Sequence, residues 1–209
     1  MLRFTLFGIP VQVQPWFWLT MAFIGGGARA NTKEALLLLA LFILAGFISI
    51  LVHELGHALT GRAFGARSAI TLQAFGGYAE FSGTRFNRPQ QFLVTAAGPF
   101  VQIVLGGAIF VALHFLGDLK SEAGYFWVSL AWISIVWAVL NLLPVMPLDG
   151  GQMLNAVLGP ERIKLTLWIT IITAAVAGVA IFQWTGSILF ALFMGLFAYQ
   201  SWQALRQRF

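Results

Sequence analysis

The chain has 209 residues, of which 59% are hydrophobic and only 9% are charged, and its mean hydropathy is +0.86. Soluble domains carry about 25% charged residues, so this composition excludes an ordinary globular protein and predicts a polytopic membrane protein, with one domain over residues 1–209. The absence of cysteine excludes disulfides and thiolate ligands, and leaves His, Asp, Glu or water for any metal site.

Apolar segments alternate with short loops along the whole chain. Residues 2–14 alternate apolar and polar side chains, which predicts a short N-terminal ribbon. Residues 67–83 are too short and too rich in glycine to span a membrane, and predict a hairpin or a re-entrant strand pair. Transmembrane helices are predicted over residues 15–28, 35–64, 89–116, 125–143, 163–182 and 187–205. The expected fold class is all-α, with about six transmembrane helices, a short membrane-associated β-hairpin and the N-terminal ribbon.

The positive charges indicate an orientation for these helices. With six spans, nine basic residues fall on one side of the membrane: Arg3, Arg62, Arg67, Arg85, Arg88, Arg162, Lys164, Arg206 and Arg208. Three fall on the other side: Arg29, Lys33 and Lys120. The positive-inside rule then predicts that both termini and the helix end after His57 are cytoplasmic. If residues 15–28 do not span, Arg3 changes sides and the bias is eight to four, with the same orientation. Basic residues scattered over short loops form no nucleic-acid-binding face.

One predicted helix contains the pattern His53-Glu54-Leu55-Gly56-His57. Residues i and i+4 share a helix face, so His53 and His57 can reach one metal ion, with Glu54 placed to accept a proton from metal-bound water. The alternative is that these are ordinary polar residues on a wet helix face. Ionisable side chains at membrane depth cost several kcal/mol, which favours the metal site.

A catalytic zinc site needs a third protein ligand, and two acidic residues compete for this role. Glu80 belongs to the predicted hairpin near the motif. Asp149 follows a helix that ends on the same side as His57, in a break rich in Pro and Gly of the kind that lines cavities in membranes. An ordinary Asp-Gly turn is the alternative for Asp149. The residue types favour Asp149 as a ligand and leave Glu80 open.

The His53–His57 motif, combined with Asn141 and the distant run Pro147-Leu148-Asp149-Gly150-Gly151, resembles the site-2 protease family of intramembrane zinc metalloproteases. The resemblance implies that His53, His57 and Asp149 bind Zn²⁺ and that Glu54 is the catalytic base. It also implies that Asn141 donates to the substrate or the oxyanion. Gln102 stands where the family often has Asn. No PDZ or CBS module is recognised, so the resemblance is to the minimal core.

The function implied is zinc-dependent endoproteolysis of transmembrane proteins or peptides within the lipid bilayer, as in regulated intramembrane proteolysis, with the active site open to the cytoplasm. A substrate helix must unwind before cleavage, and the hairpin offers a strand edge where it can pair again. The candidate substrate-binding residues are Gln73, Phe75, Gly76 and Gly77. Two alternatives remain: a proteolytically inactive zinc-binding scaffold, which would not need Glu54, and a metal transporter, whose ligands would be spread along a path across the membrane.

Overall fold

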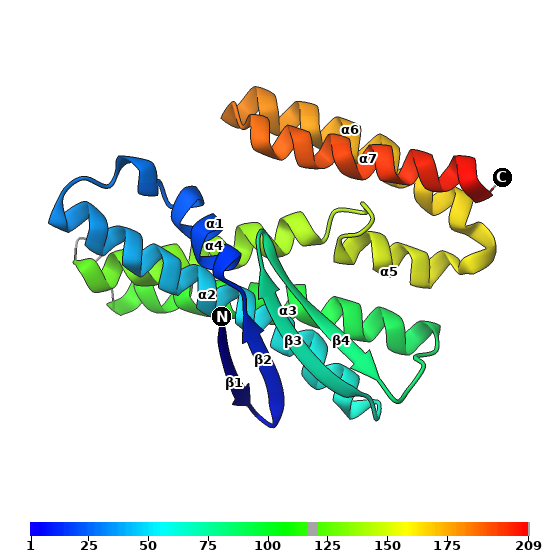
Figure 1. Ribbon diagram of the computed structural model, residues 1–209, viewed down its shortest axis with the longest axis horizontal. Helices are drawn as coiled ribbons and strands as arrows, with labels where there is room; N and C mark the ends of the chain where they lie inside the picture. Colours follow the sequence, from blue (N-terminus) through cyan, green and yellow to red (C-terminus); the bar gives the residue numbers. More distant parts are fainter. Residues whose placement is uncertain (117–120, 209) are drawn as a thin grey trace. The chain divides into compact units, whose positions relative to one another are not determined.

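The computed structural model describes residues 1–116 and 121–208 (Figure 1). The described helices are α1 (Pro15–Ile24), α2 (Lys33–Ala63), α3 (Arg88–Leu116), α4 (Glu122–Asn141), α5 (Asp149–Leu158), α6 (Ile163–Thr185) and α7 (Ile188–Arg208). The strands are β1 (Leu2–Leu6), β2 (Ile9–Val13), β3 (Arg67–Gln73) and β4 (Gly76–Ser82). Lys120, which was assigned to a loop on the second side of the membrane, lies outside the described residues.

The chain divides into two compact units. The first comprises Met1–Arg85 and Ala97–Ala138, and the second comprises Phe86–Ala96 and Val139–Phe209. The expectation of a single functional domain over the whole chain stays a prediction.

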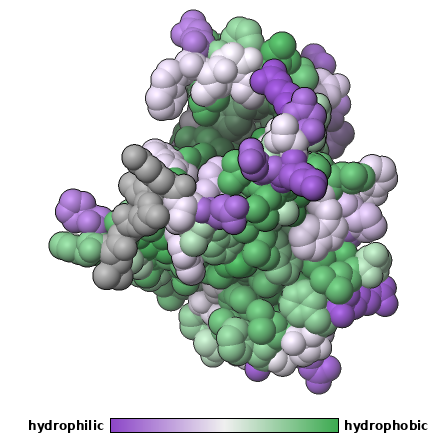
Figure 2. All heavy atoms as spheres, turned by 90° about the vertical axis from the view of Figure 1, so that its left-hand side faces the viewer, coloured by the Kyte–Doolittle hydropathy of each residue, from purple (hydrophilic) through white to green (hydrophobic). Residues whose placement is uncertain are grey.

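Five of the described helices are long and apolar enough to cross a membrane: α2, α3, α4, α6 and α7. This confirms the predicted class of helical membrane protein, and apolar side chains cover much of the face seen in Figure 2. The first predicted span is shorter than expected. Helix α1 has ten residues and is therefore only about 15 Å long, half the thickness of the hydrocarbon core. The sequence places Gly25, Gly26 and Gly27 directly after it, and the helix ends there.

The N-terminal ribbon and the hairpin, which were predicted separately, form one four-stranded sheet in the order β1-β2-β3-β4. Strands β1 and β2 are joined by a tight turn in which Phe7 and Gly8 both have positive φ, at 51° and 74°. Parallel pairing of β2 with β3 then joins the two hairpins, with Val11 opposite Ile70. Among the described residues, strand β4 pairs with β3 alone and forms one edge of the sheet.

The sheet packs on the half of α2 that contains the histidine motif. Alternate residues of β2 and β3 are buried, as the period of two in a strand requires. They form one core cluster with Ile50, Leu51, Leu55 and Ala58 of α2. At the end of α2, the guanidinium of Arg62 donates a hydrogen bond to the carbonyl oxygen of Phe7 in the β1–β2 turn. The motif is therefore next to a core cluster of the first unit.

In the second unit, the chain after α4 is irregular over residues 142–148 and then forms α5, a helix that the sequence analysis did not predict. Its end is held by Arg88, whose Nε donates to the carbonyl oxygen of Ala156 at 2.9 Å and whose guanidinium also donates to Val157. Helices α6 and α7 form an antiparallel pair whose core contains Ala174 and Met194 together with Val145. Both ends of α5 are thus fixed within this unit.

Candidate metal centre and active site

The two motif histidines face each other on α2. The Nε2 atoms of His53 and His57 lie 3.0 Å apart, and both side chains are buried, with 3% and 7% of their surface exposed. The one-turn spacing puts both rings on one face of the helix, with their centroids 4.6 Å apart. Two imidazole nitrogens directed at the same point, in a buried place, are what a metal ion requires of two ligands.

Helix α3 packs against α2 at the two histidines. The helices approach closely at Gly56 of α2, where an added Cβ atom would lie 2.7 Å from the carbonyl oxygen of Ala97 in α3. The next residue of α3, Gly98, lies against the His57 ring, and one turn further along Oε1 of Gln102 lies 2.8 Å from Nδ1 of His53. Sequence patterns alone predict no role for Gln102. Only the pairing of the two helices brings it to His53.

Glu54 is buried beside the histidines, with 4% of its surface exposed. Its neighbour from the sheet is Gly77 of β4, where a Cβ atom would lie 2.8 Å from Cγ and 2.9 Å from Oε1 of Glu54. Glycine is therefore required at Gly77 for the edge strand to approach the carboxylate. This contact explains why a glycine-interrupted hairpin follows a helix with a metal-binding motif.

Asp149 is the first residue of α5 in the second unit, and only 8% of it is exposed. It is not part of an Asp-Gly turn, which was the alternative. The backbone of residues 142–146 folds onto Gly150 and Gly151 so closely that a side chain at either glycine would overlap it. The loop is ordered further by a hydrogen bond from the Met146 amide to Thr170 Oγ1, at 3.1 Å. Asn141, the last residue of α4, is half-buried immediately before this loop. The Gly-Gly pair thus sets the start of α5, and with it Asp149.

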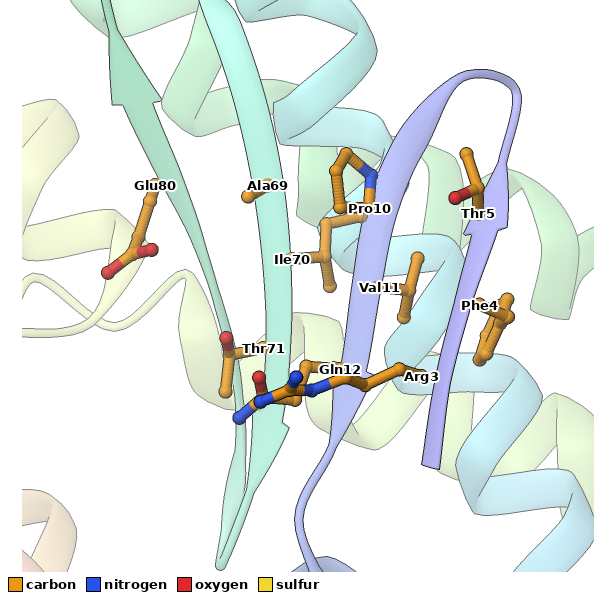
Figure 3. Close-up of a pocket in the computed structure, with 10 residues that line it drawn as sticks. All are labelled: Arg3, Phe4, Thr5, Pro10, Val11, Gln12, Ala69, Ile70, Thr71 and Glu80. Atoms are coloured by element: carbon orange, nitrogen blue, oxygen red, sulfur yellow. The ribbon is translucent and has the colours of Figure 1, made fainter. Parts of the chain in front are cut away.

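Among the residues that the structure describes, His53, His57 and Asp149 form a group that could hold a metal ion. All three are buried, and two imidazoles with one carboxylate make the ligand set of an open, catalytic zinc site. The donor set therefore fits zinc. Glu80 is outside this group: it is exposed on β4 and lines a shallow pocket over the sheet together with Arg3, Gln12 and Thr71 (Figure 3).

The four candidate substrate-binding residues lie at the tip of the β3–β4 hairpin. Gln73 and Phe75 are exposed, whereas Gly76 is buried near Trp137 and has a φ of 139°, which favours glycine. Gly77 contacts Glu54, as described above. The hairpin tip is thereby brought next to the candidate base.

Comparison with known proteins gives a consistent result. The profile described as "Peptidase family M50" matches residues 41–122 and 117–182. A zinc metalloprotease of Methanocaldococcus jannaschii is 28% identical over 159 residues, covering 76% of this chain and 45% of that protein. A putative zinc metalloprotease of Synechocystis sp. is 35% identical over 167 residues, covering 73% of this chain and 42% of that protein. This chain thus spans less than half the length of these two relatives.

Among solved structures, the site-2 protease from Methanocaldococcus jannaschii has a TM-score of 0.68, covering 97% of this chain and 94% of that one. At 24% sequence identity this likeness shows the fold. The profile match carries the family assignment, because its two segments together include His53, Glu54, His57 and Asp149. The chain belongs to peptidase family M50, the site-2 protease family of zinc metalloproteases.

Proposed function

We propose that this chain is a zinc-dependent intramembrane endopeptidase, which hydrolyses peptide bonds in or near the transmembrane segments of other membrane proteins. The observation that carries the proposal is the convergence of the two buried Nε2 atoms of His53 and His57, with Glu54 beside them, on a helix apolar enough to cross a membrane. A structural zinc site would have no use for an adjacent carboxylate that is not a ligand.

The residues have distinct roles in this reaction. His53, His57 and Asp149 would hold the zinc ion, which when bound would supply a Lewis acid for the scissile carbonyl and for the attacking water. Glu54 accepts a proton from that water at its carboxylate and delivers it to the leaving amine. Asn141 donates a hydrogen bond to the oxygen that becomes negatively charged. Burial of Glu54 and the histidines strengthens each electrostatic interaction, because solvent screening is weak there.

Substrate binding is assigned to the hairpin tip at Gln73, Phe75, Gly76 and Gly77. A peptide bond in a transmembrane helix is protected by the hydrogen bonds of that helix, so the substrate must unwind. Pairing with the free edge of β4 gives the unwound segment new backbone partners. Because Gly77 is on this edge and contacts Glu54, a strand added there passes close to the candidate base.

The site is further proposed to open toward the cytoplasm. The orientation rests on the positive-inside bias of the loops. The sheet supports it, because the β1–β2 turn is bonded to Arg62, at the end of α2 that follows His57. Arg3 is thus on the same sheet as Arg67 although α1 does not span by itself. Counting Arg3 on the side of Arg67, because both lie in this sheet, makes the bias nine to three.

The test is cleavage by the purified chain in liposomes, with a labelled transmembrane peptide as substrate. Cleavage that stops with a zinc chelator and returns with added Zn²⁺ is the expected result. Zinc binding without cleavage of any of a panel of transmembrane peptides would favour the scaffold alternative. Zinc flux into the same liposomes would favour the transporter.

A further inference from the structure

Gln102 of α3 is fully buried and has hydrogen-bonding partners at both ends of its amide. Its Oε1 lies 2.8 Å from Nδ1 of His53, and its Nε2 lies 3.2 Å from the carbonyl oxygen and 2.9 Å from Oγ of Ser49. Burying an amide side chain without hydrogen bonds costs several kcal/mol of free energy. These contacts therefore provide the hydrogen bonds that the buried amide of Gln102 needs.

The partners determine which way the amide points. The carbonyl oxygen of Ser49 can only accept a hydrogen bond, so the amide atom next to it must be the NH₂ group. The other amide atom is then the oxygen, which faces His53 Nδ1 and can itself only accept. The hydrogen in that contact must come from the imidazole. A neutral His53 therefore carries its proton on Nδ1 and has a lone pair on Nε2.

This tautomer is the one that a metal site at Nε2 needs. Nε2 of His53 is the atom directed at Nε2 of His57, where the two ligand atoms converge. Without an acceptor at Nδ1, the proton of His53 would gain a partner by moving to Nε2 and donating to His57 across 3.0 Å. In that arrangement, Nε2 of His53 and Nε2 of His57 would be joined by a hydrogen bond, and neither could bind a metal ion.

We propose that Gln102 is a positioning residue of the zinc centre, which fixes the tautomer and ring orientation of His53 and so keeps its Nε2 unprotonated, as a metal ligand must be. Partners of this kind, bonded to the second nitrogen of a ligand histidine, raise metal affinity by orienting the ligand. A carboxylate is common in this role, but the amide performs it without adding a charge in a membrane protein's interior.

A chain of hydrogen bonds holds the amide itself. Ser49 of α2 accepts from Gln102, and its Oγ lies 2.9 Å from Oγ of Ser134 on α4. Ser49 and Ser134 are both fully buried. Three helices that are long and apolar enough to cross a membrane are thus linked through one series of hydrogen bonds that ends on His53. The donor capacity of the Gln102 NH₂ group is used on α2, which prevents the amide from flipping.

The first test needs no metal. The chain contains three histidines, so their ¹⁵N signals in a detergent micelle can be assigned with His57→Gln and His114→Gln variants. In metal-free protein, the neutral form of His53 should carry its proton on Nδ1, which faces the Gln102 oxygen. In Gln102→Met, which matches the length of the side chain but lacks the acceptor, the Nε2-protonated form should become populated. In Gln102→Glu the Nδ1 proton should remain, because a carboxylate accepts from it equally well.

Zinc affinity, measured by competition with a chelator, gives the second readout. Gln102→Met should bind zinc about 10–100-fold more weakly, which is the usual effect of losing such a partner. Gln102→Glu should recover most of the lost zinc affinity. Ser134→Ala, which changes the far end of the series of hydrogen bonds, should lower zinc affinity less than Gln102→Met does.

The inference rests on the zinc centre and not on proteolysis, since both readouts apply to protein that cleaves nothing. It is overturned if His53 keeps its Nδ1 proton in the Gln102→Met variant and the zinc affinity of that variant is within about twofold of that of the unmodified chain. It is equally overturned if neutral His53 in the Gln102→Glu variant carries its proton on Nε2 instead of Nδ1. That variant alone tests the proposal if Gln102→Met does not fold.

Discussion

Gly98 of α3 lies directly against the imidazole of His57, so that a methyl group on Gly98 would overlap the Nε2 and Cε1 atoms of that ring. Four residues further along the same helix, Gln102 contacts His53. The two helices therefore meet in an antiparallel register in which each ligand histidine has its own residue on α3: a small one that leaves room for His57, and an amide that holds His53.

This contact makes a prediction for Gly98→Ala. The methyl group must displace His57 Nε2, the atom that faces His53, so zinc affinity should fall about 10–100-fold, as it does when the support of a ligand is lost. Gly107→Ala is the matched control, because it lies on the same helix with nothing within 4 Å of an added Cβ. Chelator competition on both proteins measures the difference. Equal zinc affinities would show that the His57 ring is not confined by α3.

Replacing Glu54 separates metal binding from catalysis. Glu54→Gln keeps the size of the side chain but cannot accept a proton, so it should retain one zinc ion per chain and lose about 10²–10⁴-fold in cleavage rate. Elemental analysis and turnover of a transmembrane peptide measure the two effects. Stoichiometric zinc with near-normal turnover would contradict the assignment of Glu54 as the base.

The third ligand is tested by comparing two carboxylates. Asp149→Ala should lower zinc occupancy together with activity, since a site with two histidines alone binds zinc weakly. Glu80→Ala should leave both nearly unchanged, because Glu80 is exposed on the sheet and outside the potential metal group. The reverse result, with zinc lost only in Glu80→Ala, would require a different third ligand.

Much of this site could be predicted from the sequence because its chemistry is local. His53, Glu54 and His57 are within one and a half turns of one helix, so spacing alone brings the two rings to one face. The long apolar helices also follow from hydropathy. The β3–β4 hairpin is predictable because its glycines and its length exclude a span.

What the sequence analysis missed depends on contacts between distant segments. Nothing in residues 2–14 or 67–83 alone indicates that β2 pairs in parallel with β3, which joins two separately predicted hairpins. Helix α5 is ten residues long and starts within a run of Pro and Gly, which predicts irregular backbone. The role of Gln102 depends on which residue of α2 lies opposite it, and periodicity along one helix does not contain that information.

Cysteine labelling tests the proposed orientation, since the native chain has no cysteine. Ser82→Cys at the exposed end of β4 should react with an impermeant thiol reagent from the cytoplasmic side, and Ala123→Cys in the exposed first turn of α4 from the opposite side. Gly65 is unsuitable, because its φ of 89° strains any side chain. Labelling of the two positions from the reversed sides would reverse the proposed topology and the side from which water enters.

The free edge of β4 gives the last prediction. Gln73 and Gly76 flank a two-residue turn, so alternation along the strand directs the backbone N–H groups of Gly77 and Ala79 away from β3. Proline at Ala79 removes one outward donor and leaves the proposed zinc ligands unchanged. Leu72→Pro would be a poorer test, since Leu72 is fully buried in β3 and its loss would disrupt the sheet.

We expect Ala79→Pro to reduce cleavage of helical transmembrane substrates about fivefold or more, the effect of losing one hydrogen bond of about 1 kcal/mol. Short peptides that are already extended should lose less, because they have no helix to unwind and less need of new backbone partners. Ala79→Val is the matched control: it adds similar bulk but keeps the N–H group. Both variants should contain the same amount of zinc. Should Ala79→Pro and Ala79→Val cleave helical substrates equally well, the edge of β4 takes no part in holding the unwound substrate.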